Sequence, residues 1–216
     1  MKNSEFPAEI FDLDCRQCPR LSQFLDGVKV EHPDYHARPV APFGVRNPRI
    51  LVVGLAPGMH GANATGRPFT GDYAGILLYE TLYKFGFSNQ AEASARDDGL
   101  KLTKCRITNA VKCLPPANKP TGAEIKICNQ FLKAELESLN KGVVILALGG
   151  IALKSVLSAL GLKQSDYKFG HGVEYSLPNG LTLISSYHCS RYNTQTKRLT
   201  GKMFEDVFKK ITRLID

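Results

Sequence analysis

The segment Arg49-Ile-Leu-Val-Val53, followed by Gly54-Leu-Ala-Pro-Gly-Met-His-Gly61, decides the fold of this 216-residue chain. Four consecutive aliphatic side chains predict a strand that is buried on both faces. The glycine-rich stretch that continues to Gly71 predicts a long loop, and the apolar pattern from about Ala74 to Phe85 predicts a helix. Strand, loop and helix together form the repeating unit of an α/β protein.

The same alternation of buried strands and helices continues toward the C-terminus. Further strands are predicted at Cys105 to Asn109, Val143 to Leu148 and Thr182 to Ser186. The intervening helices are predicted after the capping box Thr121-Gly-Ala-Glu124, through Leu160, and from Thr200 to Leu214, with a hairpin turn at Pro178-Asn-Gly180. This pattern predicts a three-layer α/β/α fold around a central, mainly parallel, four-stranded sheet.

Composition restricts the class of protein. With 43% hydrophobic residues, the chain can bury one core, so we expect a single domain over 1–216, with a cysteine-bearing segment, 1–48, packed onto an α/β core, 49–216. The net charge of +8 and the pI near 9.2 favour a polyanionic partner. No apolar run is long enough for a bilayer and the N-terminus is unlike a secretion signal, so we expect a cytoplasmic monomer without membrane contact.

Four of the six cysteines are spaced as metal ligands. Cys15-Arg-Gln-Cys18 is a C-x-x-C pair, and Cys113 and Cys128 complete a set of four if the N-terminal segment folds back onto the core. Four thiolates suit either tetrahedral zinc or an iron-sulfur cluster, and the residues alone also allow unligated, buried cysteines. Cys105 and Cys189 have no suitable spacing.

Ligands of such sheets bind beyond the carboxyl ends of the strands. The residues at those ends are the loop Gly54 to Asp72, Asn109, Gly149-Gly150 and His188. The loop lacks the final Lys-Ser/Thr of a phosphate-binding P-loop and also lacks the G-x-G-x-x-G pattern of dinucleotide-binding proteins. The loop therefore contains neither of the two motifs that would indicate nucleotide binding.

Several motifs resemble, in order, those of the uracil-DNA glycosylase superfamily, and in particular its iron-sulfur-containing family 5. They are Gly54-Leu-Ala-Pro57, Gly66-Arg-Pro-Phe-Thr-Gly-Asp72, Thr108-Asn-Ala-Val-Lys-Cys113 and Ser186-Tyr-His-Cys-Ser-Arg191, and the resemblance covers nearly the whole chain. Ala56 stands where the superfamily usually has a polar, water-activating residue and where family 4 usually has a carboxylate, which points to family 5.

The resemblance implies a base-excision repair enzyme that flips a damaged nucleotide out of DNA and hydrolyses its N-glycosidic bond. It implies uracil as the main substrate, with hypoxanthine and xanthine as further substrates and an abasic site as the product. Phe69 would stack on the flipped base, beside Gly54, Leu55 and Ala56. The amide of Asn109 would hydrogen-bond with the polar edge of uracil.

Two further residues have implied catalytic roles. His188 would donate a hydrogen bond to O2 of the departing base, and Asp72 would activate the attacking water because Ala56 cannot. Without the resemblance, each of these four side chains has a simpler interpretation. Asp72 would cap the following helix, His188 would be structural, Phe69 would be a core residue and Asn109 would end a strand or form a turn.

The basic segment after His188 is predicted to contact DNA. Its candidate residues are Ser190, Arg191, Tyr192, Lys197 and Arg198. Arg191 or Tyr192 would fill the gap that the flipped nucleotide leaves, and the others would contact phosphates. A solvated loop is the alternative interpretation.

For the metal site, the resemblance implies a 4Fe-4S cluster with a structural task, held by Cys15, Cys18, Cys113 and Cys128, and zinc is the alternative. Two other functions remain open at the level of sequence. One is a family 4-like glycosylase restricted to uracil. The other is a non-catalytic nucleic-acid-binding module that a metal stabilises.

Overall fold

The computed structural model describes residues 6–215 and contains a six-stranded sheet in the order β1-β3-β2-β4-β6-β5. Its four central strands are parallel to one another. They are β2 (Ile50–Gly54), β3 (Cys105–Asn109), β4 (Val144–Leu148) and β6 (Thr182–Ser186). Nearly every residue in them is buried, as expected for parallel strands covered on both faces.

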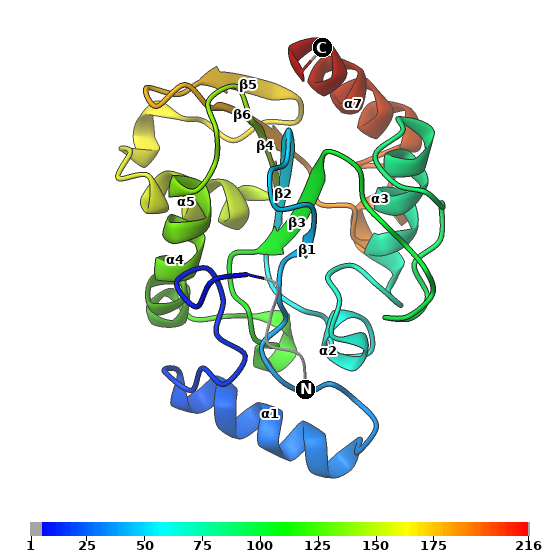
Figure 1. The fold of residues 1–216 in the computed structure, drawn as a ribbon, viewed down its shortest axis with the longest axis vertical. Coiled ribbons are helices and arrows are strands. Elements are labelled where there is room, and N and C mark those ends of the chain that lie inside the picture. Colours follow the sequence, from blue (N-terminus) through cyan, green and yellow to red (C-terminus); the bar gives the residue numbers. More distant parts are fainter. Residues whose placement is uncertain (1–5, 216) are drawn as a thin grey trace.

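Helices cover both faces of the sheet (Figure 1). They are α3 (Tyr73–Lys84) and α7 (Gly201–Ile215) on one face, and α4 (Gly122–Glu137) and α5 (Gly150–Ala159) on the other. Alternate residues of β2 enter the two resulting cores. Ile50 and Val52 pack in the core that contains α3 and α7, whereas Leu51 and Val53 pack in the core that contains α4 and α5. The three-layer α/β/α prediction is therefore confirmed.

The number of strands differs from the prediction, because two antiparallel strands extend the edges of the sheet from four strands to six. β1 (Phe43–Gly44) pairs with β3, and β5 (Val173–Ser176) pairs with β6. β1 has only two residues and lies in a proline-rich segment. β5 alternates between half-buried and exposed residues, so neither strand has the continuous apolar run from which the others are predicted.

The N-terminal segment contains a helix that the sequence analysis does not predict, α1 (Pro19–Glu31), which begins directly after Cys18. Its apolar residues pack against the segment that follows β3: Leu21 joins a cluster with Val111, and Leu25 joins one with Leu114. The remaining short helices are α2 (Ala62–Thr65), α6 (Arg191–Gln195) and the 3-10 turns η1 (Pro116–Asn118) and η2 (Gln164–Asp166). Within residues 6–215, no helix is long and apolar enough to cross a membrane.

A buried group of charges joins β3 to α4. Glu135 of α4 lies 3.4 Å from the guanidinium of Arg106 and 3.4 Å from the ammonium of Lys112, and all three side chains are almost fully buried. Burial lowers the pKa of Arg106, and the negative charge of Glu135 opposes that effect. Buried charges are tolerated when they are paired in this way, so the network fixes the segment after β3 against α4.

Candidate active site

The carboxyl ends of β2 and β3 bring Gly54 and Asn109 side by side, because the two residues are paired in register. Gly54 is closely surrounded. A Cβ atom built on it would lie 2.4 Å from Oδ1 of Asn109 and 2.7 Å from Cζ of Phe69. Any side chain at this position would displace Asn109 and Phe69, so the absence of a Cβ at Gly54 lets both side chains lie close to its backbone.

Asn109 is 4% exposed, and its Oδ1 has no hydrogen-bond partner among the described residues. A buried acceptor without a partner costs free energy, and Asn109 Oδ1 is one of only three such side-chain atoms among the described residues, with Asn63 Oδ1 and Ser155 Oγ. The Asn109 oxygen is therefore available to a donor on a ligand.

Phe69 lies in a left-handed backbone conformation, with φ of 53°, and its side chain is buried. Its carbonyl group packs against Gly75 of α3, where a built Cβ would lie only 1.9 Å from the oxygen. Tyr79, also on α3, donates a hydrogen bond of 2.8 Å to the carbonyl of Pro68. The start of α3 thus holds the ring of Phe69 in place.

A buried ion pair supports the same loop from its other side. Arg67 donates two hydrogen bonds to Asp98, of 2.8 and 2.6 Å, and a third of 2.8 Å to Oγ1 of Thr70. The Arg67 guanidinium holds the pKa of Asp98 well below its usual range. This bidentate pair fixes the residues on both sides of Phe69.

His188 follows the end of β6 by two residues, and its ring lies 5.9 Å from that of Phe69, with 29° between the planes. Burial lowers its pKa to about 4, so the imidazole is neutral at pH 7 and carries one N–H group. Asn193 of α6 donates a hydrogen bond of 2.8 Å to the His188 carbonyl and so fixes the backbone there.

Asp72 caps α3, as the simpler interpretation predicts. Its Oδ1 accepts a hydrogen bond of 2.9 Å from the backbone N–H of Gly75. Burial raises the pKa of Asp72, and backbone N–H groups oppose that effect. The other oxygen, Oδ2, faces the loop after β2, since a Cβ built on Gly61 would lie 2.5 Å from it. One oxygen is occupied by the cap and the other lies beside the loop.

The two remaining base-site candidates are placed differently. The carbonyl of Leu55 accepts a hydrogen bond of 2.9 Å from the N–H of Val111, which extends the pairing of β2 and β3. The side chain of Ala56 packs against the apolar cluster that contains Val111 and Cys128. The base-site loop and the cysteines thus adjoin the same apolar cluster.

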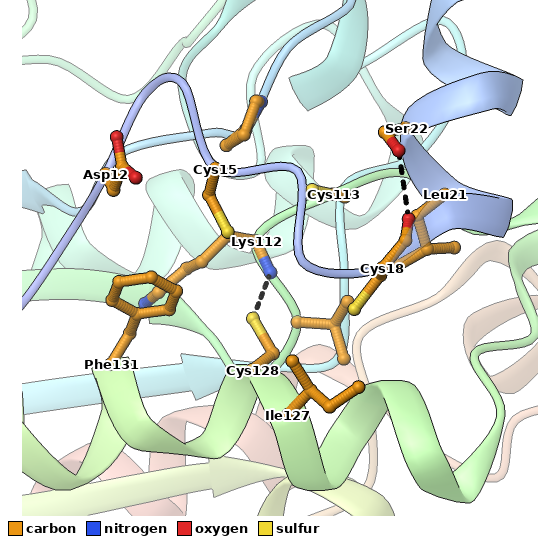
Figure 2. Close-up of a pocket in the computed structure, with 12 residues that line it drawn as sticks. Asp12, Cys15, Cys18, Leu21, Ser22, Lys112, Cys113, Ile127, Cys128 and Phe131 are labelled. Carbon is orange, nitrogen blue, oxygen red and sulfur yellow. Dashed lines mark hydrogen bonds between the residues drawn. The ribbon is translucent and has the colours of Figure 1, made fainter.

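Cys15, Cys18, Cys113 and Cys128 line one small pocket, together with apolar side chains such as Leu21 and Phe131. Figure 2 shows the four thiols around this pocket, contributed by the N-terminal segment, the segment after β3, and α4. The backbone N–H of Lys112 donates to the sulfur of Cys128 at 3.3 Å. Within residues 6–215, no three Cys, His, Asp or Glu side chains gather closely enough to hold a single metal ion.

The thiols of this pocket influence one another electrostatically. Burial raises the pKa of Cys18 to about 11, and neighbouring negative charges at Cys128, Glu124 and Cys15 raise it further. Burial likewise raises the pKa values of Cys113 and Cys128. Four thiolates at this place require a cation among them, so the donor set fits a metal centre.

Sequence comparisons show the family of the chain. The model of the uracil DNA glycosylase superfamily matches residues 41–212. The chain belongs to the uracil-DNA glycosylase superfamily. A type-5 uracil-DNA glycosylase of Thermus thermophilus is 46% identical, over 93% of each chain. The type-5 enzyme of Pyrobaculum aerophilum is 40% identical, over 92% of this chain and 88% of its own.

Type-4 uracil-DNA glycosylases are more distant relatives of this chain. The type-4 uracil-DNA glycosylase of Thermotoga maritima is 34% identical, over 74% of this chain and 75% of its own. The resemblance to family 5 is therefore confirmed.

The segment that the superfamily resemblance assigns to DNA contact forms α6 and the turn after it. Ser190 caps α6 by accepting a hydrogen bond from Asn193 N–H. The guanidinium of Arg191 lies 5.8 Å from the centre of the Tyr73 ring, and that of Arg198 lies 4.8 Å from the centre of the Tyr187 ring. Tyr192 is 70% exposed and Lys197 is exposed, so this part of the surface is available to a partner.

Three residues that support this glycosylase site are absent from the sequence analysis: Tyr79, Asp98 and Asn193. Each acts through a hydrogen bond with a residue that is distant in the sequence or with a backbone carbonyl. Asp98, for example, is 31 residues from Arg67, in a loop without regular structure. No local pattern could have identified it.

Proposed function

We propose that this protein removes uracil from DNA by hydrolysing the N-glycosidic bond, which leaves an abasic site. One observation carries the proposal: Phe69, Asn109 and His188 come together beside Gly54, at the carboxyl ends of three parallel strands. An aromatic face, an amide and a neutral imidazole can together recognise a flipped pyrimidine. The names of the type-5 relatives support the same activity.

Asn109 would read the edge of the base. Its unpartnered Oδ1 would accept a hydrogen bond from N3–H of uracil, and its amide N–H would donate to O4. Cytosine has the opposite donor and acceptor at these two positions. The amide would therefore favour uracil, with Phe69 stacking on the face of the base.

His188 would stabilise the leaving group. Negative charge develops on the base as the bond to deoxyribose breaks, and an N–H group directed at O2 lowers the barrier. Because its pKa is about 4, His188 is a neutral donor over the physiological pH range. A neutral donor also does not hold the uracil anion as an ion pair after bond cleavage.

Asp72 would orient the attacking water through Oδ2, while Oδ1 continues to cap α3. The raised pKa makes its carboxylate a stronger base than an exposed aspartate. An Asp72→Asn variant retains the cap acceptor but not the charge. If this variant kept full activity, Asp72 would have no role in water activation.

Cys15, Cys18, Cys113 and Cys128 would hold a 4Fe-4S cluster. Resemblance to family 5 favours this cluster, and a single tetrahedral zinc is the alternative. The cluster would supply a cross-link between the N-terminal segment and the core. Iron and sulfide in a 1:1 ratio would support this assignment, whereas one zinc per chain would show that the four cysteines bind zinc instead.

The half-buried Ser190 and the exposed residues Arg191, Tyr192, Lys197 and Arg198 would contact DNA, with Arg191 or Tyr192 entering the vacated position in the stack. We further propose that the chain acts as a single-domain, cytoplasmic monomer on single- or double-stranded DNA. By resemblance to family 5, hypoxanthine and xanthine would be additional substrates.

The test is incubation with a duplex that contains one uracil, followed by alkaline cleavage of the abasic product. Wild-type protein should cleave the strand, whereas Asn109→Ala and His188→Ala should each slow the single-turnover rate by about 100-fold or more. Parallel duplexes with hypoxanthine or xanthine test the wider substrate range. Binding of all these duplexes without base release would favour the non-catalytic alternative.

A further inference from the structure

A group of three aromatic rings lies on the surface next to the proposed active site. The rings of His32 and Tyr35 are stacked, with centres 4.5 Å apart and 13° between the planes. The hydroxyl group of Tyr35 is hydrogen-bonded to Nδ1 of His60 at 2.8 Å. The His60 ring meets the other two nearly at right angles and is exposed.

The group is rigidly attached on both sides. His32 ends α1, and Tyr35 packs against the apolar cluster that includes Leu25. The next residues are fixed to α2, because the N–H groups of His36 and Ala37 donate to carbonyl groups there. Figure 1 shows α1 at the lower end of the molecule, with α2 between it and α3. The rings are therefore held in position and do not move with a free loop.

His60 directly precedes Gly61, which contacts the proposed catalytic residue Asp72. The neighbouring Gly61 lies against the carboxylate of Asp72, with 2.5 Å between its built Cβ and Oδ2. A nucleotide whose deoxyribose is attacked by a water on Asp72 has its own phosphate groups only a few bonds away. An exposed donor at His60 is suitably placed to meet one of them.

Three cationic side chains act electrostatically on His36, the residue that follows Tyr35. The charges of Arg96, Arg38 and Lys29 add to burial in lowering the pKa of the neighbouring His36. Arg38 is paired with Asp14, and Lys29 donates to the carbonyl of Tyr35. Arg96 is exposed, and no carboxylate within residues 6–215 forms an ion pair with it. This guanidinium is available to an anion.

We propose that His60, oriented by Tyr35 and accompanied by Arg96, binds a backbone phosphate of the damaged DNA strand. In the tautomer that this proposal requires, Tyr35 donates its hydroxyl hydrogen to Nδ1, and the proton of the neutral His60 ring lies on Nε2, where it can be donated to a phosphate. The contact is separate from that of α6, and it rests on the proposed DNA glycosylase function.

The experiment measures fluorescence anisotropy of a duplex that contains 2′-fluoro-2′-deoxyuridine, a slowly hydrolysed analogue. His60→Ala should weaken binding about tenfold, because a hydrogen bond to a charged group is lost. His60→Gln can accept from Tyr35 and donate to phosphate, so it should restore most of the affinity. Tyr35→Phe keeps the stacked ring but not the hydroxyl, and its affinity should lie between those of His60→Ala and wild type.

Arg96→Gln should decrease the slope of log affinity against log salt concentration by about 0.9, as expected for one lost phosphate contact. Lys141→Gln is the matched control, since Lys141 is exposed just before the amino-terminal end of β4, whereas the proposed site lies at the carboxyl ends of the strands. It should leave the slope close to that of wild type.

Two outcomes would overturn the inference. The first is wild-type affinity in both His60→Ala and Tyr35→Phe. The second is unchanged affinity with a lower single-turnover rate at saturating DNA, which would mean that His60 acts on Asp72 through Gly61. Neither outcome bears on the glycosylase activity, which fails only if the wild-type protein releases no uracil.

Discussion

Replacing Gly54 with alanine tests the proposed base site with a single methyl group. The added Cβ would lie 2.4 Å from Asn109 Oδ1 and 2.7 Å from Phe69 Cζ, whereas ordinary contacts begin at 3.4 Å. The side chain of Asn109 must therefore retreat by about 1 Å, and the Phe69 ring by slightly less. Both obstacles are ends of side chains, so the backbone of β2 can remain in place.

The expected result is a large loss of rate with a small loss of stability. Misplacing a catalytic or substrate-positioning group by about 1 Å costs on the order of 100-fold in rate. Crowding by one methyl group typically lowers the free energy of unfolding by about 1 to 3 kcal/mol, and movable side chains favour the lower end. The assay is single-turnover cleavage of a uracil duplex, alongside thermal denaturation.

Gly27→Ala is the control for this substitution. Gly27 lies in α1 with nothing within 4 Å of a built Cβ, so the same methyl group should leave the rate unchanged. If Gly54→Ala acts through Asn109, combining it with Asn109→Ala should add little to either single effect. A Gly54→Ala rate within threefold of wild type would refute the assigned geometry.

Three further outcomes are expected. When the pH falls from 6.5 to 5, His188→Asn should lose less stability than wild type, as measured by thermal denaturation. The pKa of His188 is about 4 in the folded protein and about 6.5 in the unfolded chain. Acid therefore protonates the unfolded wild-type chain first, which lowers the stability of the folded state. Equal losses would show that the imidazole is not buried in its neutral form. Cys128→Ser should lose bound metal by elemental analysis, whereas Cys105→Ala, at a core cysteine outside the pocket, should retain it. Reversing the charges of Lys197 and Arg198 should weaken DNA binding and reduce its salt dependence, and an unchanged slope would remove this turn from the interface.

The sequence predicts the central elements because their patterns are local. β3 matches its predicted range, Cys105 to Asn109, and the capping box at Thr121 is present with both of its hydrogen bonds. The parallel order of the strands also predicts that Gly54 and Asn109 lie at the same edge, and their register confirms it. These features depend on neighbours in the chain or on the general rules for parallel sheets.

The features that were missed depend on contacts between distant residues. The hydrogen bond between Tyr35 and His60 joins two loops that have no regular pattern. Helix α1 differs, because Leu21, Leu25 and Val28 recur at helical spacing after Pro19, so a signal was present.

The left-handed conformation of Phe69 has a consequence for protein engineering. A residue with a Cβ atom is less stable in this conformation than glycine by about 1 kcal/mol or more, so Phe69→Gly would relax the main chain while removing the ring. The ring is buried in the core, however, and deleting a buried aromatic side chain costs about 3 to 5 kcal/mol, so the lost packing outweighs the relief of the main chain. Selection for heat resistance and selection for repair should therefore both retain an aromatic ring at position 69.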